Sequence, residues 1–149
     1  MDSQDCVKFA NQSKLAYFTT ADGDQPRVRP IGLWFADDHG FYFQTEANKA
    51  FYLQIKANKK VGVCFYGPQC GSDLGTVVRV AGEVELVDDP SLKARVLQDR
   101  PFLKAMGIDK PEHPLLGVFC VSNGEAFFWT MQDNMKESEA PRVKFGQRR

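Results

Sequence analysis

The segment from Phe43 to Lys49 combines the residue types that a phosphate site requires. It reads Phe-Gln-Thr-Glu-Ala-Asn-Lys, a β-forming run followed by a hydroxyl, an amide and a lysine where the spacing predicts the start of a helix. The first N–H groups of a helix have no acceptor within the helix and carry partial positive charge, so they suit an anion. In this interpretation Thr45 donates to a phosphate and Lys49 supplies a charge.

The same residues also have a structural interpretation, which their spacing alone favours over the phosphate site. Thr45 or Asn48 caps the helix while Lys49 lies in solvent, and spacing alone favours capping because short polar helix starts are common. Arg29, on the neighbouring predicted strand, strengthens the phosphate interpretation, because a guanidinium contacts a phosphate through two parallel hydrogen bonds. The residues alone do not decide between the two interpretations.

Other motifs that carry chemistry are absent from the 149 residues. The chain has no GxGxxG after a strand, no GxxxxGK[ST], no GxSxG and no HExxH. The two histidines, His39 and His113, lie at no ligand spacing from each other or from a cysteine pair, so we expect no metal site. The function must therefore come from another kind of site.

The cysteines are expected to be reduced thiols. A domain of this size that is rich in aromatic residues and has no export signal does not need disulfides. Cys64 and Cys120 lie in apolar runs and are expected in the core. Cys70, in the loop 67–72, is expected to be exposed, and a catalytic role for its thiol is the less favoured interpretation.

Charge and length narrow the class of protein. Nineteen basic and nineteen acidic residues cancel, so neither nucleic acid nor an anionic membrane is an expected partner. The acidic first residues lack an apolar signal region, and no apolar run approaches the roughly 20 residues of a membrane helix. We expect a cytoplasmic protein with one domain, residues 1–149, whose core spans about 14–131 and whose polar tail, 132–149, is loosely held.

The order of β-forming runs and turns predicts a mainly β fold. Strands are expected over 15–20, 27–36, 41–45, 60–66, 75–88, 115–121 and 125–131, and helices over 47–57 and between the start signal at 88–91 and Pro101. The first three strands are expected to form a meander, and the last two a hairpin through an Asn-Gly turn. This order, βββαββαββ, favours an antiparallel barrel with two short flanking helices over a parallel sheet.

Several of these segments together resemble the pyridoxamine 5′-phosphate oxidase-like, FMN-binding split β-barrels. The segments that carry the resemblance are 27–32, 41–45, 48–50, 61–66, 80–86 and 128–129. The resemblance runs roughly from Lys14 to Met131, with the segments in the family's order. The chain is more similar to the compact, nitroimidazole-resistance-type relatives, because the Arg-x-His segment that follows the tryptophan in true oxidases has no counterpart in 132–149.

The resemblance implies an FMN cofactor and assigns residues to it by position. The implied cofactor-binding residues are Arg29, Pro30, Ile31, Gln44, Thr45, Asn48, Lys49, Thr76 and Trp129. Arg29 and Lys49 are implied to meet the FMN phosphate, with Thr45 nearby. The backbone around Pro30, Ile31 and Gln44 is implied to meet the isoalloxazine ring.

The family resemblance also implies a homodimer with two sites at its interface. Thr76 and Trp129 are implied to come from the partner subunit, although a buried core position is an equally good interpretation of Trp129. A volume argument agrees with the dimer. Because the interior of a small barrel is filled by its own side chains, a flavin has to lie outside it, in a crevice between subunits.

The implied activity is an oxidoreductase that passes electrons from a reduced nicotinamide or flavin donor to a small planar acceptor, with the flavin performing the transfer. No residue is an obvious acid or base, so no catalytic residue is assigned, and oxidation of pyridoxamine phosphate itself is disfavoured. The alternative is a module without enzymatic activity that binds or stores a flavin or heme, because a fold does not fix a function.

Overall fold

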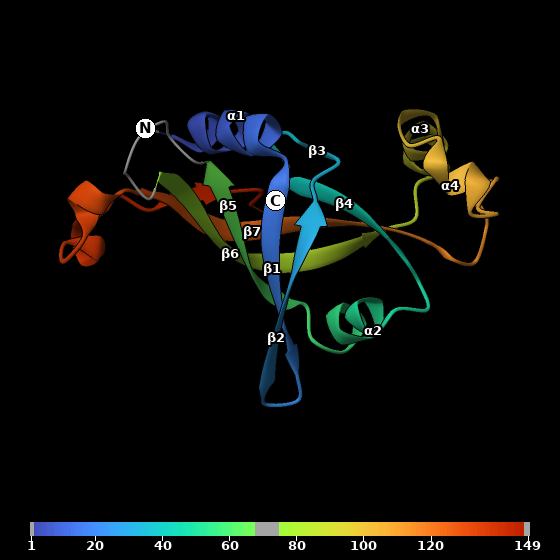
Figure 1. Ribbon diagram of the computed structural model, residues 1–149, viewed down its shortest axis with the longest axis horizontal. Helices are drawn as coiled ribbons and strands as arrows, with labels where there is room; N and C mark the ends of the chain where they lie inside the picture. Colours follow the sequence, from blue (N-terminus) through green and yellow to red (C-terminus); the bar gives the residue numbers. More distant parts are fainter. Residues whose placement is uncertain (1, 68–74, 148–149) are drawn as a thin grey trace.

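The computed structural model describes residues 2–67 and 75–147, which form a curled antiparallel sheet with helices around it (Figure 1). The helices are α1 (Ser3–Ser13), α2 (Ala50–Ala57), α3 (Pro90–Asp99) and α4 (Phe102–Ala105). The strands are β1 (Leu15–Asp22), β2 (Gln25–Gly32), β3 (Phe35–Ala36), β4 (Phe41–Glu46), β5 (Lys60–Gly67), β6 (Thr76–Val87), β7 (Leu116–Trp129) and β8 (Val143–Phe145). In these described ranges, every helix is too short or too polar to cross a membrane.

The strands pair in the order β2-β1-β5-β6-β7-β4-β3, with β8 added to β7, and every pair is antiparallel. The two ends of this order, β2 and β3, are consecutive in the chain and are joined only by Leu33 and Trp34. A connection of that length spans about 10 Å at most, so the sheet has to curl until its edges approach each other. The predicted mainly β, antiparallel split barrel is thereby confirmed.

The predicted three-strand meander is confirmed only in part: its third strand, β4, pairs with residues 35–36 of the second predicted strand, which form β3, but not with β2. β1 and β2 form a hairpin, but β4 pairs with β3 and β7 on the other side of the sheet. The predicted strand 27–36 is divided at the buried residues Leu33 and Trp34, because the N–H of Leu33 donates to the carbonyl of Lys14, next to β1, whereas the N–H of Trp34 donates to the carbonyl of Tyr42 on β4. Pro30 lies on β2, an end strand of the sheet, as its missing N–H predicts.

The predicted hairpin over 115–131 is also wrong, because β7 is one strand from Leu116 to Trp129. Asn123 has a positive φ of 49°, and the register with β6 shifts between Ala81 and Glu83. A Cβ atom at Gly124 would clash with the carbonyl of Ala81. The Asn-Gly pair therefore makes a β-bulge that bends a continuous strand, where its composition predicts a turn.

Two segments are more ordered than the sequence predicts. α1 begins with a capping box made by Asp2 and Asp5 and buries Cys6 and Ala10. The tail, predicted to be loosely held, continues into β8, where Phe145 is buried and its ring contacts that of Phe41 edge-on, with centroids 5.1 Å apart. Two helices beyond the two predicted ones, α1 and α4, thus complete the fold.

Two apolar clusters share β4. The barrel interior is filled by phenylalanines, and α2 closes one end of it with Phe51 and Ile55. The second cluster lies between the other face of β4 and helices α3 and α4, and it includes Cys120, as predicted. Cys64 is only half-buried, on the outer face of β5, so its predicted core position is wrong. Cys70 lies outside the described residues.

Candidate functional site

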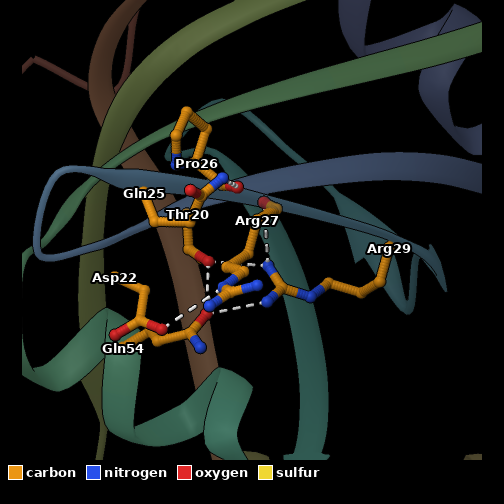
Figure 2. A network of polar contacts seen from close by, with 7 residues as sticks. All are labelled: Thr20, Asp22, Gln25, Pro26, Arg27, Arg29 and Gln54. Carbon is orange, nitrogen blue, oxygen red and sulfur yellow. Dashed lines mark hydrogen bonds and ion pairs between the residues drawn. The ribbon is translucent and has the colours of Figure 1, made fainter.

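Strand β2 and helix α2 place Arg29 at the end of the barrel that α2 closes. Arg29 lies opposite Phe18 of β1, so its side chain is on the inner face of the sheet. Its guanidinium carbon lies 4.6 Å from the centroid of the Phe51 ring, on α2. A charged side chain is thus held between a strand and a helix that the chain brings together from distant positions (Figure 2).

Among residues 2–67 and 75–147, the guanidinium of Arg29 donates only to uncharged acceptors. Nη1 donates to the hydroxyl of Thr20 at 2.7 Å and, at longer range, to the carbonyls of Phe18 at 3.3 Å and Arg27 at 3.4 Å. Nη2 donates to the side-chain oxygen of Gln54 at 2.7 Å, and Thr20 donates to that same oxygen at 2.6 Å (Figure 2). These contacts position the guanidinium without neutralising it.

No carboxylate in the part of the chain that the structure describes forms an ion pair with Arg29, whereas the neighbouring Arg27 pairs with Asp22 at 3.3 Å. Burial and the charge of Arg27 accordingly lower the pKa of Arg29. Its Nε–H has no acceptor among residues 2–67 and 75–147. Because Nε–H and one Nη2 N–H lie on the same edge of a planar guanidinium, that edge can take an oxyanion through two hydrogen bonds.

The start of α2 lies beside this arginine. The N-cap of α2 is Lys49, and no side chain forms a capping hydrogen bond there. Thr45 is buried inside β4 and Asn48 precedes the cap, so the interpretation that one of them caps the helix is wrong. The helix, predicted to start at residue 47, starts at Ala50. Its first N–H groups therefore have no side-chain acceptor in the described chain.

Arg29 contacts the first turn of α2 through the ring of Phe51. Phe51, which lies under the guanidinium, follows Lys49 by two residues, about 3 Å along the helix axis. The Lys49 ammonium is exposed and lies 3.5 Å from the carboxylate of Glu46. The structure thus places Arg29 against the side chain of Phe51 in the first turn of α2 and Lys49 at the N-cap of the same helix, with Thr45 near the end of the preceding strand.

Gln44 lies on the opposite face of β4 from Thr45 and belongs to a second polar contact. Its side-chain oxygen accepts a hydrogen bond from Nη1 of Arg100 at 3.2 Å, and Nη2 of Arg100 donates to the Gly32 carbonyl at 3.3 Å. Burial lowers the pKa of Arg100. Arg100, the C-cap of α3, thereby connects β4 to the end of β2. The sequence does not predict this contact, because an arginine before a proline indicates only the end of a helix.

The remaining predicted residues are distributed over the sheet. Pro30 lies opposite Tyr17 on the outer face, and Ile31 lies opposite Ala16 and packs against the core. Thr76 and Trp129 lie at the far end of the sheet, where β6 begins and β7 ends, whereas Thr45 is paired with the first residues of β7. Within one subunit, Thr76 and Trp129 do not lie beside Arg29. That a partner subunit contributes them to the site stays a prediction.

Thr20 and Gln54 were not predicted, although the sequence holds a signal for both. Every second residue of β1 faces inward, so Thr20 lies on the same inner face as Ala16 and Phe18. In α2, Gln54 follows the buried Phe51 by three residues, which places both on one face of the helix. A polar residue at an inward-facing position of each element indicates a buried polar contact.

The outer face of the sheet carries a groove of about 360 Å³. It crosses β2, β1, β5 and β6 and is lined by residues that include Tyr17, Val28, Cys64 and Arg79. Tyr17 and Val28 are exposed for 41% and 67% of their surface. Exposed apolar side chains that adjoin one another on a sheet face are typical of a surface that another molecule covers.

The curled sheet with its closing helix defines a split β-barrel. Residues 3–130 match the family model described as pyridoxamine 5′-phosphate oxidase. Because this match covers most of the chain, the protein belongs to that family, as the resemblance of its segments predicts.

Similar proteins support the same assignment. A pyridoxine/pyridoxamine 5′-phosphate oxidase from Agrobacterium fabrum is 32% identical over 114 residues, which cover 75% of this chain and 53% of the relative. The chain thus spans about half the length of the curated relatives that it matches. A NimC/NimA family protein from Clostridium acetobutylicum has a TM-score of 0.74 at 24% identity, covering 93% of this chain and 90% of its own.

The heme storage protein HutZ from Vibrio cholerae has a TM-score of 0.65 at 11% identity, covering 87% of this chain and 95% of its own. At these identities the two structural neighbours show the fold alone.

Proposed function

We propose that this protein is a flavoprotein that binds FMN, with the FMN phosphate at Arg29, Lys49 and the first turn of α2. The observation that carries the proposal is the guanidinium of Arg29, which is fixed by uncharged acceptors and keeps one edge without a partner in the described chain. A phosphate supplies the negative charge and the paired acceptors that this edge lacks. The family, whose resemblance implies FMN, supports the proposal.

When bound, FMN supplies the electron transfer, and the chain's own residues bind and orient it. Arg29 and Lys49 hold the phosphate end. Gln44, whose amide oxygen is taken by Arg100, keeps its amide N–H groups for a neighbouring acceptor. We propose a reduced nicotinamide or flavin as the electron donor and a small planar molecule as the acceptor. Oxidation of pyridoxamine phosphate remains disfavoured, because residues 132–149 contain no histidine.

We further propose that a second copy of the chain covers the outer face of the sheet, which creates two equivalent sites. The exposed Tyr17 and Val28 and the groove beside them support this interface. Light scattering coupled to gel filtration tests it. We expect twice the monomer mass of 16.8 kDa, and a monomer at micromolar concentration contradicts the dimer.

The cofactor is tested by unfolding the purified protein and separating the released chromophore by chromatography. We expect FMN in stoichiometric amount, and the protein prepared without it should bind FMN again. A Soret band in the absorbance spectrum would instead favour heme storage, the alternative function. A protein that releases no flavin and fails to take up added FMN contradicts the proposal.

A further inference from the structure

We propose that Thr20 and Gln54 are positioning residues that make the site selective for a phosphate: they fix Arg29 through uncharged groups and so preserve its charge for the ligand. The inference rests on the proposed FMN function and names what sets the specificity of that site. It assigns a particular role to Gln54. The amide of Gln54 accepts from Arg29 at a position where a carboxylate would neutralise the charge of the arginine.

The three side chains form a closed triangle of hydrogen bonds whose direction is determined. A guanidinium has only donors, so the Thr20 hydroxyl accepts from Arg29 at 2.7 Å. The single proton of Thr20 is then available for Gln54, whose oxygen accepts it at 2.6 Å and also accepts from Arg29 at 2.7 Å. The amide of Gln54 must therefore present its oxygen, because its NH₂ group cannot accept from the guanidinium.

Burial makes this arrangement rigid. Thr20 is 2% exposed, on the inner face of β1, and the Phe51 ring supports the guanidinium from α2. A ring face attracts a cation but leaves its net charge unchanged. The guanidinium is thus held by β1 and by α2 through contacts that leave its full charge in place.

The neighbouring arginine shows the arrangement that Arg29 avoids. Arg27 lies two residues earlier on β2, and the carboxylate of Asp22 pairs with it. Both arginines lie on β2 and, being two residues apart, on the same face of it, and Figure 2 shows them together. The chain places an acid beside the exposed arginine and uncharged acceptors beside the half-buried one. A carboxylate at position 54 would accept from Arg29 as Gln54 does and would then compete with a bound phosphate for its charge.

The consequence is a test that separates charge from contact. Riboflavin has the flavin ring without the phosphate, so its affinity should not depend on the charge at position 54. Gln54→Glu keeps the size of the side chain and adds a negative charge, whereas Gln54→Met keeps the length and remains neutral. Asp22→Asn removes the acid beside Arg27 and is the matched control for a change of one charge at this strand end.

The experiment titrates flavin-free wild type and the three variants with FMN and with riboflavin, following flavin fluorescence. For Gln54→Glu we expect the dissociation constant of FMN to rise at least about tenfold, the scale of one charge-assisted hydrogen bond, while that of riboflavin changes less than about twofold. Gln54→Met should raise the FMN constant by a smaller factor, and Asp22→Asn should not raise it. Circular dichroism of each variant verifies that it is folded.

Three outcomes have distinct meanings. A wild type that binds neither flavin overturns the proposed function and this inference with it. A wild type that prefers FMN, together with a Gln54→Glu variant that keeps the same preference, overturns the inference alone. Equal losses in Gln54→Glu and Gln54→Met also overturn it, because the loss would then come from the missing contact and not from the added charge.

Discussion

Two arginine clusters on opposite faces of the sheet use the same side chain in different ways. On the inner face, Arg29 donates to a hydroxyl, an amide and backbone carbonyls and has no carboxylate partner in the described chain. On the outer face, Arg79 pairs with the carboxylate of Glu137 and lies 5.3 Å from the ring centroid of Phe127. A second arginine of this outer cluster, Arg142, has its guanidinium carbon 3.7 Å from the centroid of the same ring.

The difference lies in what balances the charge. The carboxylate of Glu137 neutralises the charge of Arg79, and the carbonyls of Glu137 and Ala140 accept hydrogen bonds from Arg142. The outer cluster therefore holds the C-terminal segment against the sheet. In the inner cluster, no carboxylate of the described residues balances the charge of Arg29. We infer that the outer arginines serve the fold and the inner one serves a ligand, and the following substitutions test this division.

The largest expected effect is on stability, at the anchored tail. Phe145→Ala removes a buried ring that contacts Phe41, and we expect the free energy of unfolding to fall by about 3 kcal/mol. Denaturant titration measures the loss. Met135→Ala, at a side chain of the same tail that is 96% exposed, should change stability by less than about 0.5 kcal/mol. Equal effects of the two would mean that the tail is not anchored through Phe145.

The next effect concerns the inner cluster and should appear in binding. Arg29→Gln removes the charge and should weaken FMN binding by about 2 to 3 kcal/mol, the range of hydrogen bonds to charged groups. Fluorescence titration of the flavin-free protein measures it. Arg27→Gln removes a charge that Asp22 already balances, so its effect should be far smaller. Similar losses in both variants would show that the site responds to net charge and not to Arg29.

A smaller effect is expected at the helix start. Lys49→Ala should weaken FMN binding by about 1.5 kcal/mol, the lower end of the range for a charged contact, because Glu46 at 3.5 Å already offsets part of the charge. Salt should reduce the difference from wild type, since the ammonium is exposed. An unchanged dissociation constant in low salt would place the phosphate elsewhere.

The smallest effect is expected at the outer ion pair. Glu137→Gln breaks a pair whose side chains are both about half-exposed, so we expect less than about 1 kcal/mol of lost stability and no change in flavin affinity. Thermal unfolding and the same titration measure the two quantities. A marked loss of flavin binding would contradict the separation of the two clusters.

The sequence predicts the antiparallel barrel and the position of α2 because both depend on local patterns, namely strand alternation and helical spacing. It fails where distant pairing decides. An Asn-Gly pair favours a turn locally, but at Asn123 the partners of β7 on both sides make one strand with a bulge more stable than a hairpin. The same cause explains β8, since three residues of a polar tail become a strand only when β7 is beside them.

The candidate site divides in the same way. Arg29 and Lys49 were predicted because the family resemblance marks them, and the structure places both beside the start of α2. Thr20 and Gln54 lie 34 residues apart, and their hydrogen bond depends on α2 packing against β1. Arg100 and Gln44 lie 56 residues apart, and their hydrogen bond likewise depends on α3 packing beside β4. Such contacts follow from the tertiary fold, and local sequence patterns do not contain them.

β4 is buried on both faces, with Thr45 toward the barrel and Gln44 toward α3. Gln44, which Arg100 contacts, and Thr45, which faces the barrel near α2, are therefore joined by a single peptide bond. Because the two residues are neighbours in a strand packed on both faces, a substitution that shifts Gln44 is expected to shift Thr45 as well. β4 thus contributes to both parts of the proposed site, with Thr45 on one face and Gln44 on the other.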